Sequence, residues 1–284
     1  ILLIAMGRWD MVISGYGGAQ SRPRENRETW KKERSMEHLL EVCVDSVESA
    51  LAAQEGGADR LELCGHLAIG GTTPSLALVE EVLSAMKIPV NIMIRPRFGD
   101  FCFTPAEKRI LLREVELLRD TGAKGLVLGA LLPDGRLDRE HLAACIELGG
   151  PGLNYTLHRA FDLSRDPFEA LDTALDLGFD TVLSSGQRAK APEGIELLRA
   201  MAEHVGKNMA IMAGSGVSEK NMEALARAGI RHFHFSAKQD RPSPMAFRRS
   251  GVPMGLPLAD EYTRSYTDRE TVARAKALLN SLAL

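Results

Sequence analysis

The sequence predicts an α/β protein that folds as a single (β/α)8 barrel, or TIM barrel. Short apolar runs alternate with longer segments of helical periodicity, a pattern that indicates parallel strands joined by helices. Each strand–helix unit takes about 25–35 residues, which is the size of a βαβ repeat. The chain of 284 residues is long enough for eight such units in one domain. We expect the strands at His38–Val44, Arg60–Cys64, Val90–Ile94, Gly125–Ala130, Asn154–His158, Thr181–Ser184, Met209–Ala213 and Arg231–Ser236.

Helix signals follow these strands. Ser46 is a candidate N-cap for a helix that ends at Gly56–Gly57, and Thr104 followed by Pro105 opens another. Ser218 is expected to open the seventh helix and Gly229 to close it. An open doubly wound sheet is the alternative, but no nucleotide-binding G-x-G-x-x-G follows the first strand. Eight units of similar length favour closure into a barrel.

Residues 36–284 are expected to form the barrel domain, and residues 1–35 a flexible N-terminal extension. A net charge of −3 argues against nucleic acid as the main partner. No apolar run approaches the roughly 20 residues that span a bilayer, so no membrane association is expected. The four cysteines lack the spacing of a secreted disulfide scaffold, which favours a cytoplasmic location.

Alternation within the first two strands predicts which side chains face the inside of the barrel. Alternate residues share a face, so Glu41 and Cys43 point inward while Val42 and Val44 face the helices. By the same argument Glu62 and Cys64 point inward on the second strand. We therefore expect Glu41 beside Glu62, and Cys43 beside Cys64, at matching places on adjacent strands.

Three more ionisable residues end strands at the same face. Arg95 ends the third strand, His158 the fifth, and His234 points inward on the eighth with His232 and Ser236. The candidate catalytic residues are therefore Glu41, Glu62, Arg95, His158 and His234. Such polar strand ends are where barrel enzymes carry their active sites, an arginine would attract an anion, and a Glu–His pair could move a proton. The structural alternative is a layer of buried ion pairs that only fills the barrel.

A second candidate site lies after the seventh strand, at Gly214, Ser215 and Gly216, where small residues let backbone N–H groups face an anion. Ser236 would complete this phosphate site, because the loops after strands 7 and 8 often bind phosphate in barrels. A tight turn that requires glycine explains the motif equally well. The adjacent Gly70 and Gly71 suit a loop that covers the mouth.

The inward thiols of Cys43 and Cys64 suggest a metal site. Thiolates are soft ligands that select Cu(I), and two of them can hold the ion. Buried cysteines usually only pack, however, so packing stays open as the alternative. Zinc is disfavoured because no C-x-x-C or H-x-x-H spacing appears.

These motifs also carry a family resemblance. Residues 36–284 resemble the CutC family of copper homeostasis proteins through the segments 41–46, 62–64, 70–75, 93–97, 99–101, 158–162, 233–234 and 236–237. The resemblance implies a barrel fold, a cytoplasmic location, a role in copper handling and self-association into a homo-oligomer. Phe98, Ser215 and Phe235 depart from the family pattern, and Phe235 stands where many members carry a further cysteine.

The sequence thus predicts a protein of copper homeostasis that binds Cu(I) through Cys43 and Cys64. The alternative is a barrel enzyme, of lyase or isomerase type, that acts on a small anionic or phosphorylated metabolite. A third reading is a scaffold or sensor without turnover.

Overall fold

The computed structural model describes residues 38–252, 254 and 260–282. Eight parallel strands follow one another around a closed barrel, with the last strand paired to the first. The strands are β1 (Leu39–Val44), β2 (Arg60–Leu63), β3 (Val90–Met93), β4 (Gly125–Leu128), β5 (Asn154–Leu157), β6 (Thr181–Ser184), β7 (Ala210–Ala213) and β8 (His232–Phe235). The predicted barrel is confirmed and the open sheet is excluded. The extension predicted for residues 1–35 lies outside the described residues.

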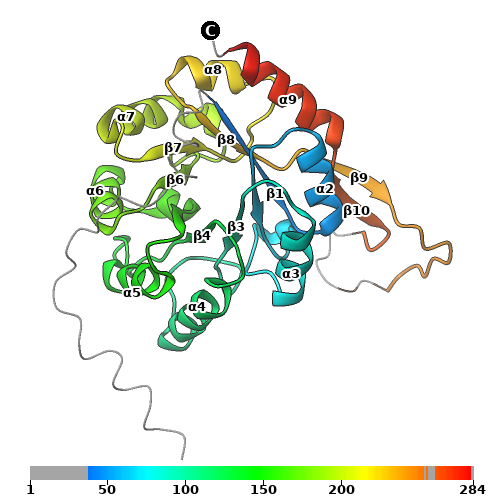
Figure 1. Ribbon diagram of the computed structural model, residues 1–284, viewed down its shortest axis with the longest axis horizontal. Coiled ribbons are helices and arrows are strands. Elements are labelled where there is room, and N and C mark those ends of the chain that lie inside the picture. The colour runs from blue at the N-terminus through cyan, green and yellow to red at the C-terminus, as the bar shows by residue number, and fades with distance from the viewer. Residues whose placement is uncertain (1–37, 253, 255–259, 283–284) are drawn as a thin grey trace, which may run out of the picture.

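Helices surround the strands as an outer ring (Figure 1). They are α2 (Val47–Glu55), α3 (Leu76–Ala85), α4 (Pro105–Leu118), α5 (Arg139–Gly149), α6 (Pro167–Leu177), α7 (Ile195–Val205), α8 (Met222–Arg227) and α9 (Arg269–Ser281). In the described part of the chain, three short 3-10 helices lie in the loops: η1 (Leu67–Ile69), η2 (Arg159–Leu163) and η3 (Ala191–Gly194). None of the helices in this part of the chain is long and apolar enough to cross a membrane.

The capping residues explain where the helices begin. The hydroxyl of Ser46 accepts the N–H of Ser49 at the start of α2, and Thr104 forms a capping box at the start of α4, as predicted. The prediction that the seventh helix begins at Ser218 is wrong. The carbonyl of Ser218 accepts the N–H groups of Asn221 and Met222 in a turn, and α8 begins only at Met222.

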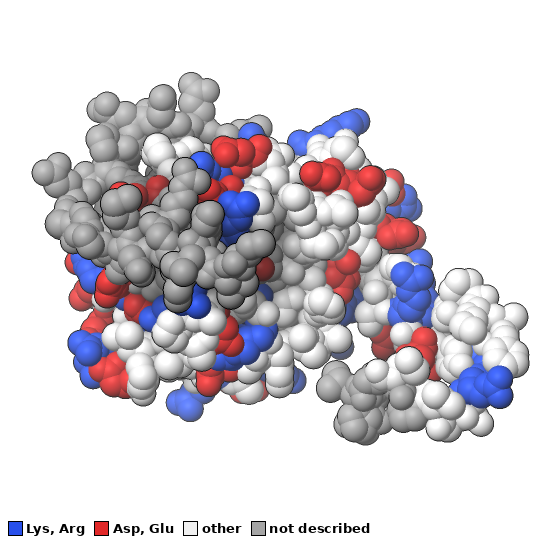
Figure 2. Space-filling view, turned by 90° about the horizontal axis from the view of Figure 1, so that it is seen from below, with Lys and Arg blue, Asp and Glu red and all other residues white. Residues whose placement is uncertain are grey.

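An antiparallel hairpin between β8 and α9 was not predicted. It consists of β9 (Lys238–Pro242) and β10 (Thr263–Thr267), and both strands are mostly exposed. The described part of the segment that joins them, residues 243–252, extends beyond the body of the barrel, and basic side chains show at its outer end (Figure 2). Its exposed apolar side chains include Met245 and Phe247.

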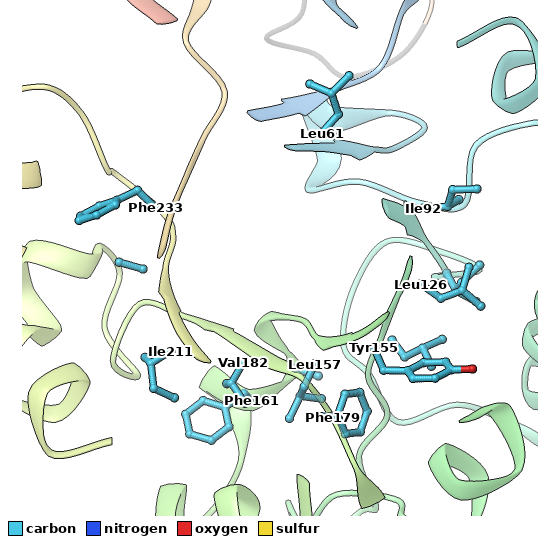
Figure 3. Close-up of a cluster of buried hydrophobic side chains, with 14 of the residues drawn as sticks. Leu61, Ile92, Leu126, Tyr155, Leu157, Phe161, Phe179, Val182, Ile211 and Phe233 are labelled. Carbon is cyan, nitrogen blue, oxygen red and sulfur yellow. The ribbon is translucent and has the colours of Figure 1, made fainter. Parts of the chain in front are cut away.

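The hydrophobic core lies between the strands and the ring of helices. Side chains such as Leu61, Ile92, Leu126 and Phe233 point away from the centre of the barrel and pack among the helices (Figure 3). This arrangement confirms the predicted alternation, because the intervening residues of each strand face the interior. The hydrophobic core is thus formed by the outward-facing side chains. Several inward-facing side chains are polar and do not belong to this core.

The ring closes where α9 crosses the end of α2. Gly56 ends α2, and a Cβ atom placed on it would lie 2.6 Å from Cβ of Val272 and 2.7 Å from the carbonyl oxygen of Arg269. The backbone of Gly56 has an ordinary helical φ of −74°. Glycine is therefore needed here for the close approach of the two helices rather than for its conformational freedom.

We expect Gly56→Ala to lower the free energy of unfolding by about 1–3 kcal/mol, because α9 must shift to make room for the methyl group. Gly152→Ala is the matched control, since a Cβ atom on Gly152 would meet no described atom within 4 Å. Urea denaturation of both variants measures the difference. Equal stability of the two variants would show that the α2–α9 contact can relax without cost.

Candidate functional site

A cavity of about 460 Å³ opens at the C-terminal ends of the strands. It brings together most of the side chains that the sequence placed at the mouth: Cys43, Glu62, Arg95, His158, Ser215, Gly216, His234 and Ser236. Glu41, Cys64 and Gly214 do not line it. Most of the predicted residues therefore line one cavity, and the other three lie outside its lining.

The predicted pairing of β1 with β2 is wrong by two residues. Glu41 lies opposite Arg60, and Cys43 lies opposite Glu62. A closed barrel requires its strands to be staggered, and this stagger shifts β2 relative to β1. As a result, Cys43 and Cys64 do not occupy matching places, and Glu41 faces a cation rather than a second carboxylate.

A buried charge cluster lies beneath the cavity. One oxygen of Glu41 accepts a hydrogen bond from Nε of Arg60 at 2.5 Å, and the other lies 2.7 Å from Nδ1 of His234. Nε2 of His234 in turn lies 3.7 Å from Oε2 of Glu62. The sequence reasoning missed Arg60, although its position two residues before Glu62 already placed it on the inner face.

The pKa values of this cluster are shifted by burial and by charge. Burial would raise the pKa of Glu41, but Arg60 and His234 outweigh it and lower the value to about 2. Burial raises the pKa of Glu62, and the nearby Glu41 adds to the rise. Burial would lower the pKa of His234, but Cys43, Glu62 and Glu41 raise it well above its usual range. His234 therefore carries its proton readily, with an anionic Glu41 behind it.

Arg95 follows β3, the strand that pairs with β2, and is only 7% exposed. Its Nη1 donates to the carbonyls of Gly70 and Gly71, and its Nη2 donates to the carbonyl of Gly99. Its Nε is buried and has no partner among the described residues. No carboxylate in that part of the chain forms an ion pair with Arg95, so its charge meets neutral carbonyls and the face of the Phe101 ring.

His158 is fixed in one orientation beside Arg95. Its Nδ1 accepts the N–H of Ala160 at 3.1 Å, so its proton lies on Nε2, which is buried and unpartnered within the described chain. Its ring occupies the space left by Gly129, where a Cβ atom would lie 2.2 Å from the ring. Burial and the charge of Arg95 lower the pKa of His158 to about 3, which keeps the ring neutral.

The predicted anion loop is only partly arranged for that role. Ser215 and Gly216 line the cavity with Ser236, and both adopt a left-handed backbone. The hydroxyl of Ser215, however, donates to the carbonyl of Ala189 and thereby holds the loop after β6. The short helix α8 begins several residues further on. A phosphate site at this loop stays a prediction.

The two thiols differ in their surroundings. Cys43 lines the cavity and contacts the carbonyl of Phe235 at 3.7 Å. Cys64 is 1% exposed, packs against Met93, and donates to Oε2 of Glu62 at 3.3 Å. Burial raises the pKa of Cys64 well above the usual value of a thiol, and Glu62 and Cys43 add to this effect. A ligand in the cavity can therefore reach Cys43 directly, but not Cys64.

A different donor set is close at hand. Glu41, Glu62 and His234 each offer a ligand atom within 4.8 Å of the others. Carboxylate and imidazole donors suit a divalent cation better than Cu(I), which prefers sulfur. Nδ1 of His234 already contacts Oε1 of Glu41 at 2.7 Å, so Nε2 is the ring nitrogen that remains for a cation.

The sequence reasoning also missed Asp162, which supports the wall of the mouth. Its carboxylate accepts from the hydroxyls of Ser184 and Ser185 and from the guanidinium of Arg159, which lines the cavity. These contacts hold η2 against the end of β6. The only sequence signal for Asp162 was that it belongs to segment 158–162, one of the segments that carry the family resemblance.

Comparison with known proteins identifies the family. The model of the CutC family matches residues 38–239. The copper homeostasis protein cutC homolog of Homo sapiens is 40% identical over 268 residues, which cover 94% of this chain and 98% of the relative. The family protein CutC of Bacteroides fragilis is 43% identical over 250 residues, covering 86% and 97% of the two chains.

Solved structures agree with this result. The crystal structure of a putative copper homeostasis protein CutC from Streptococcus agalactiae has a TM-score of 0.67 and 29% identity, and covers 70% of this chain and 98% of that one. Thiamine phosphate pyrophosphorylase from Pyrococcus furiosus (TM-score 0.53, 14% identity, 88% and 98% covered) shares the fold alone. The family model and these relatives together show that the chain belongs to the CutC family.

Proposed function

We propose that this protein is an enzyme that binds a small anionic metabolite at the barrel mouth and moves a proton on it. The observation that carries the proposal is that one cavity contains both a buried cation and a buried carboxyl group. Arg95 supplies a buried cation without a carboxylate partner in the described chain, and Glu62 supplies a buried carboxylate with an unpartnered Oε1. A buried cation without an anionic partner is costly, and so is a buried carboxyl oxygen without a hydrogen-bond donor, so both suit a ligand that completes them.

The anion would bind at Arg95. The three carbonyl contacts fix the guanidinium in place but leave its charge without an anionic partner in this part of the chain. Carboxylate and phosphate oxygens match the geometry of guanidinium donors. The cavity of about 460 Å³ is of the size that takes a small metabolite.

The proton would move at Glu62 and His234. Their pKa values are both raised, and they lie 3.7 Å apart at the wall of the cavity. Glu41 and Arg60 lie behind His234, where Glu41 holds its Nδ1 and acts as a positioning residue. Paired groups with shifted pKa values are typical of acid–base catalysis.

A second candidate function is the binding of Cu(I) by Cys43 and Cys64. Two observations favour it: relatives carry names that refer to copper homeostasis, and the thiol of Cys43 reaches the cavity. Binding by both thiols would require Cys64 to lose its proton and its contact with Glu62. A cytoplasmic location, which we also propose, would suit four cysteines that are all free. Self-association stays a prediction.

The first test concerns the anion. We expect Arg95→Gln to weaken the binding of oxalate and inorganic phosphate by about tenfold or more, because a charge-assisted contact is lost. Arg109→Gln, at an exposed position on α4, serves as the matched control and should bind like the unchanged protein. Isothermal titration calorimetry measures both. Unaltered binding in Arg95→Gln would remove Arg95 from the proposal.

The second test concerns the neutral state of His158. Its pKa in the folded protein is about 3, and an unfolded histidine titrates near 6.5. As the pH falls below about 6.5, only the unfolded state gains this proton, so stability is lost by up to about 1.4 kcal/mol per pH unit. We expect His158→Gln to remove this contribution between pH 6 and pH 4, as measured by urea denaturation. Between pH 7 and pH 8, the free energy of unfolding of His158→Gln and of the unchanged protein should vary with pH in parallel. If the two curves stay parallel at lower pH as well, His158 takes up its proton in the folded state too.

The third test concerns copper. If Cu(I) binds at the thiol pair, an anaerobic titration against a competing chelator should show one tight ion per chain. Cys43→Ser and Cys64→Ser should each abolish tight binding, because two-coordinate Cu(I) needs both sulfurs. Cys102→Ser is the control, since Cys102 lies in the loop before α4 and does not line the cavity. Binding that survives both substitutions, or that is weak in the unchanged protein, would rule out this candidate.

A further inference from the structure

We propose that the substrate is a small 2-oxocarboxylate. Arg95 would bind its carboxylate, Nε2–H of His158 would bind its keto oxygen, and Glu62 would remove a proton from the carbon next to the keto group. This inference rests on the proposed function, since it specifies the substrate class and the chemistry of the same cavity.

The donor is set by the local structure around His158. The N–H of Ala160 occupies Nδ1, which leaves Nε2–H as the hydrogen-bond donor of the ring. Gly129 makes room for the ring, and Phe101 packs against it with ring centroids 4.8 Å apart. The buried Nε2 has no partner among the described residues, although His158 lines the cavity. A ligand oxygen that only accepts, such as a keto oxygen, would satisfy it.

The position of Arg95 indicates what lies beside that oxygen. The guanidinium of Arg95 packs over the same Phe101 ring, with Cζ 4.7 Å from the ring centroid. The anion-binding group and the carbonyl-binding group are therefore neighbours on one aromatic side chain. A ligand that contacts both must carry its anionic group close to its carbonyl group, as a 2-oxocarboxylate does.

The neutral charge of His158 suits the developing enolate. A charged imidazolium would be a stronger acid than this step needs, whereas a neutral imidazole can donate a hydrogen bond and keep its proton. Burial and Arg95 keep the pKa of His158 at about 3, so the ring is neutral throughout the physiological range. This electrostatic arrangement stabilises charge on the keto oxygen without a net proton transfer from the ring.

The base lies in the same cavity. Glu62 lines the cavity, and its buried Oε1 has no hydrogen-bond partner among the described residues, so this oxygen can accept a proton from a bound ligand. In the step, the C–H bond at C3 breaks and its proton goes to Glu62. The electron pair forms a C2–C3 double bond, and the carbonyl π pair moves to the keto oxygen as an enolate. Return of a proton to C3 regenerates the substrate, so the first observable event is exchange of the C3 hydrogens with solvent.

The experiment measures this exchange. Pyruvate and 2-oxobutyrate are incubated with the protein in D2O, and loss of the C3 proton signal is followed by proton NMR. We expect the unchanged protein to accelerate exchange over buffer. Glu62→Gln should lower the saturated rate about 100-fold or more. His158→Gln should lower the saturated rate with little change in KM, and Arg95→Gln should mainly raise KM.

Control variants keep the result decisive. Arg109→Gln should exchange at the unchanged rate. Gly129→Ala, which forces the His158 ring to move, should reproduce the loss seen in His158→Gln if both variants unfold at unchanged urea concentrations. Exchange that persists in His158→Gln would overturn the role of that residue.

The outcomes also separate this inference from the proposed function. If pyruvate and oxalate bind in an Arg95-dependent way but no exchange occurs, the 2-oxocarboxylate chemistry is wrong and the anion site survives. If neither pyruvate nor oxalate binds, the proposed function fails together with the inference. Exchange that appears only after Mn²⁺ or Zn²⁺ is added would place a cation at Glu41, Glu62 and His234, and would overturn the metal-free step.

Discussion

The buried contact between Glu41 and Arg60 is the interaction on which the inside of this barrel depends. The two side chains face each other on β1 and β2, and each is almost completely buried. Without Arg60, two carboxylates and one histidine would share a site of low polarity, where unpaired charges are costly. With Arg60 present, Glu41 remains ionised and can hold His234 through Nδ1.

The consequence reaches the cavity through His234. Because Glu41 occupies one nitrogen of its ring, the other nitrogen is directed toward Glu62. Glu62 has no cation of its own at bonding distance in the described chain apart from this ring. The charges of Glu41 and Arg60 thus balance each other. The proton between His234 and Glu62 lies nearer the cavity, where a bound ligand can affect it.

The sequence predicted the barrel well because the alternation of inward-facing and outward-facing side chains along a β-strand is visible in the order of its residues. Val42 and Val44 had to meet the helices, so Glu41 and Cys43 had to face inward, and the structure confirms this. The lateral register was not predictable in the same way. The stagger of a closed barrel is set by the packing of all eight strands, and no local signal in β1 or β2 reports it. The pairing of Glu41 with Arg60 follows from that stagger.

The details of the site depended on contacts between distant segments. Arg95 was expected at the mouth, but its three carbonyl partners come from two loops whose course the sequence did not specify. The tautomer of His158 depends on the N–H of Ala160 in a short 3-10 helix that lacked a clear sequence signal. Residue identity thus predicted which groups gather, whereas their partners required the fold.

The two candidate functions make competing demands on the same residues. A copper ion bound to Cys43 and Cys64 would take away the proton that Cys64 donates to Glu62. That hydrogen bond lowers the pKa of Glu62, so its loss would raise this pKa. Two thiolates that bind one Cu(I) ion carry a net negative charge, which raises the pKa of a neighbouring carboxyl group further. Both effects would hold Glu62 in its protonated form, in which it cannot remove a proton from a substrate, so copper loading and proton abstraction by Glu62 would compete within one barrel.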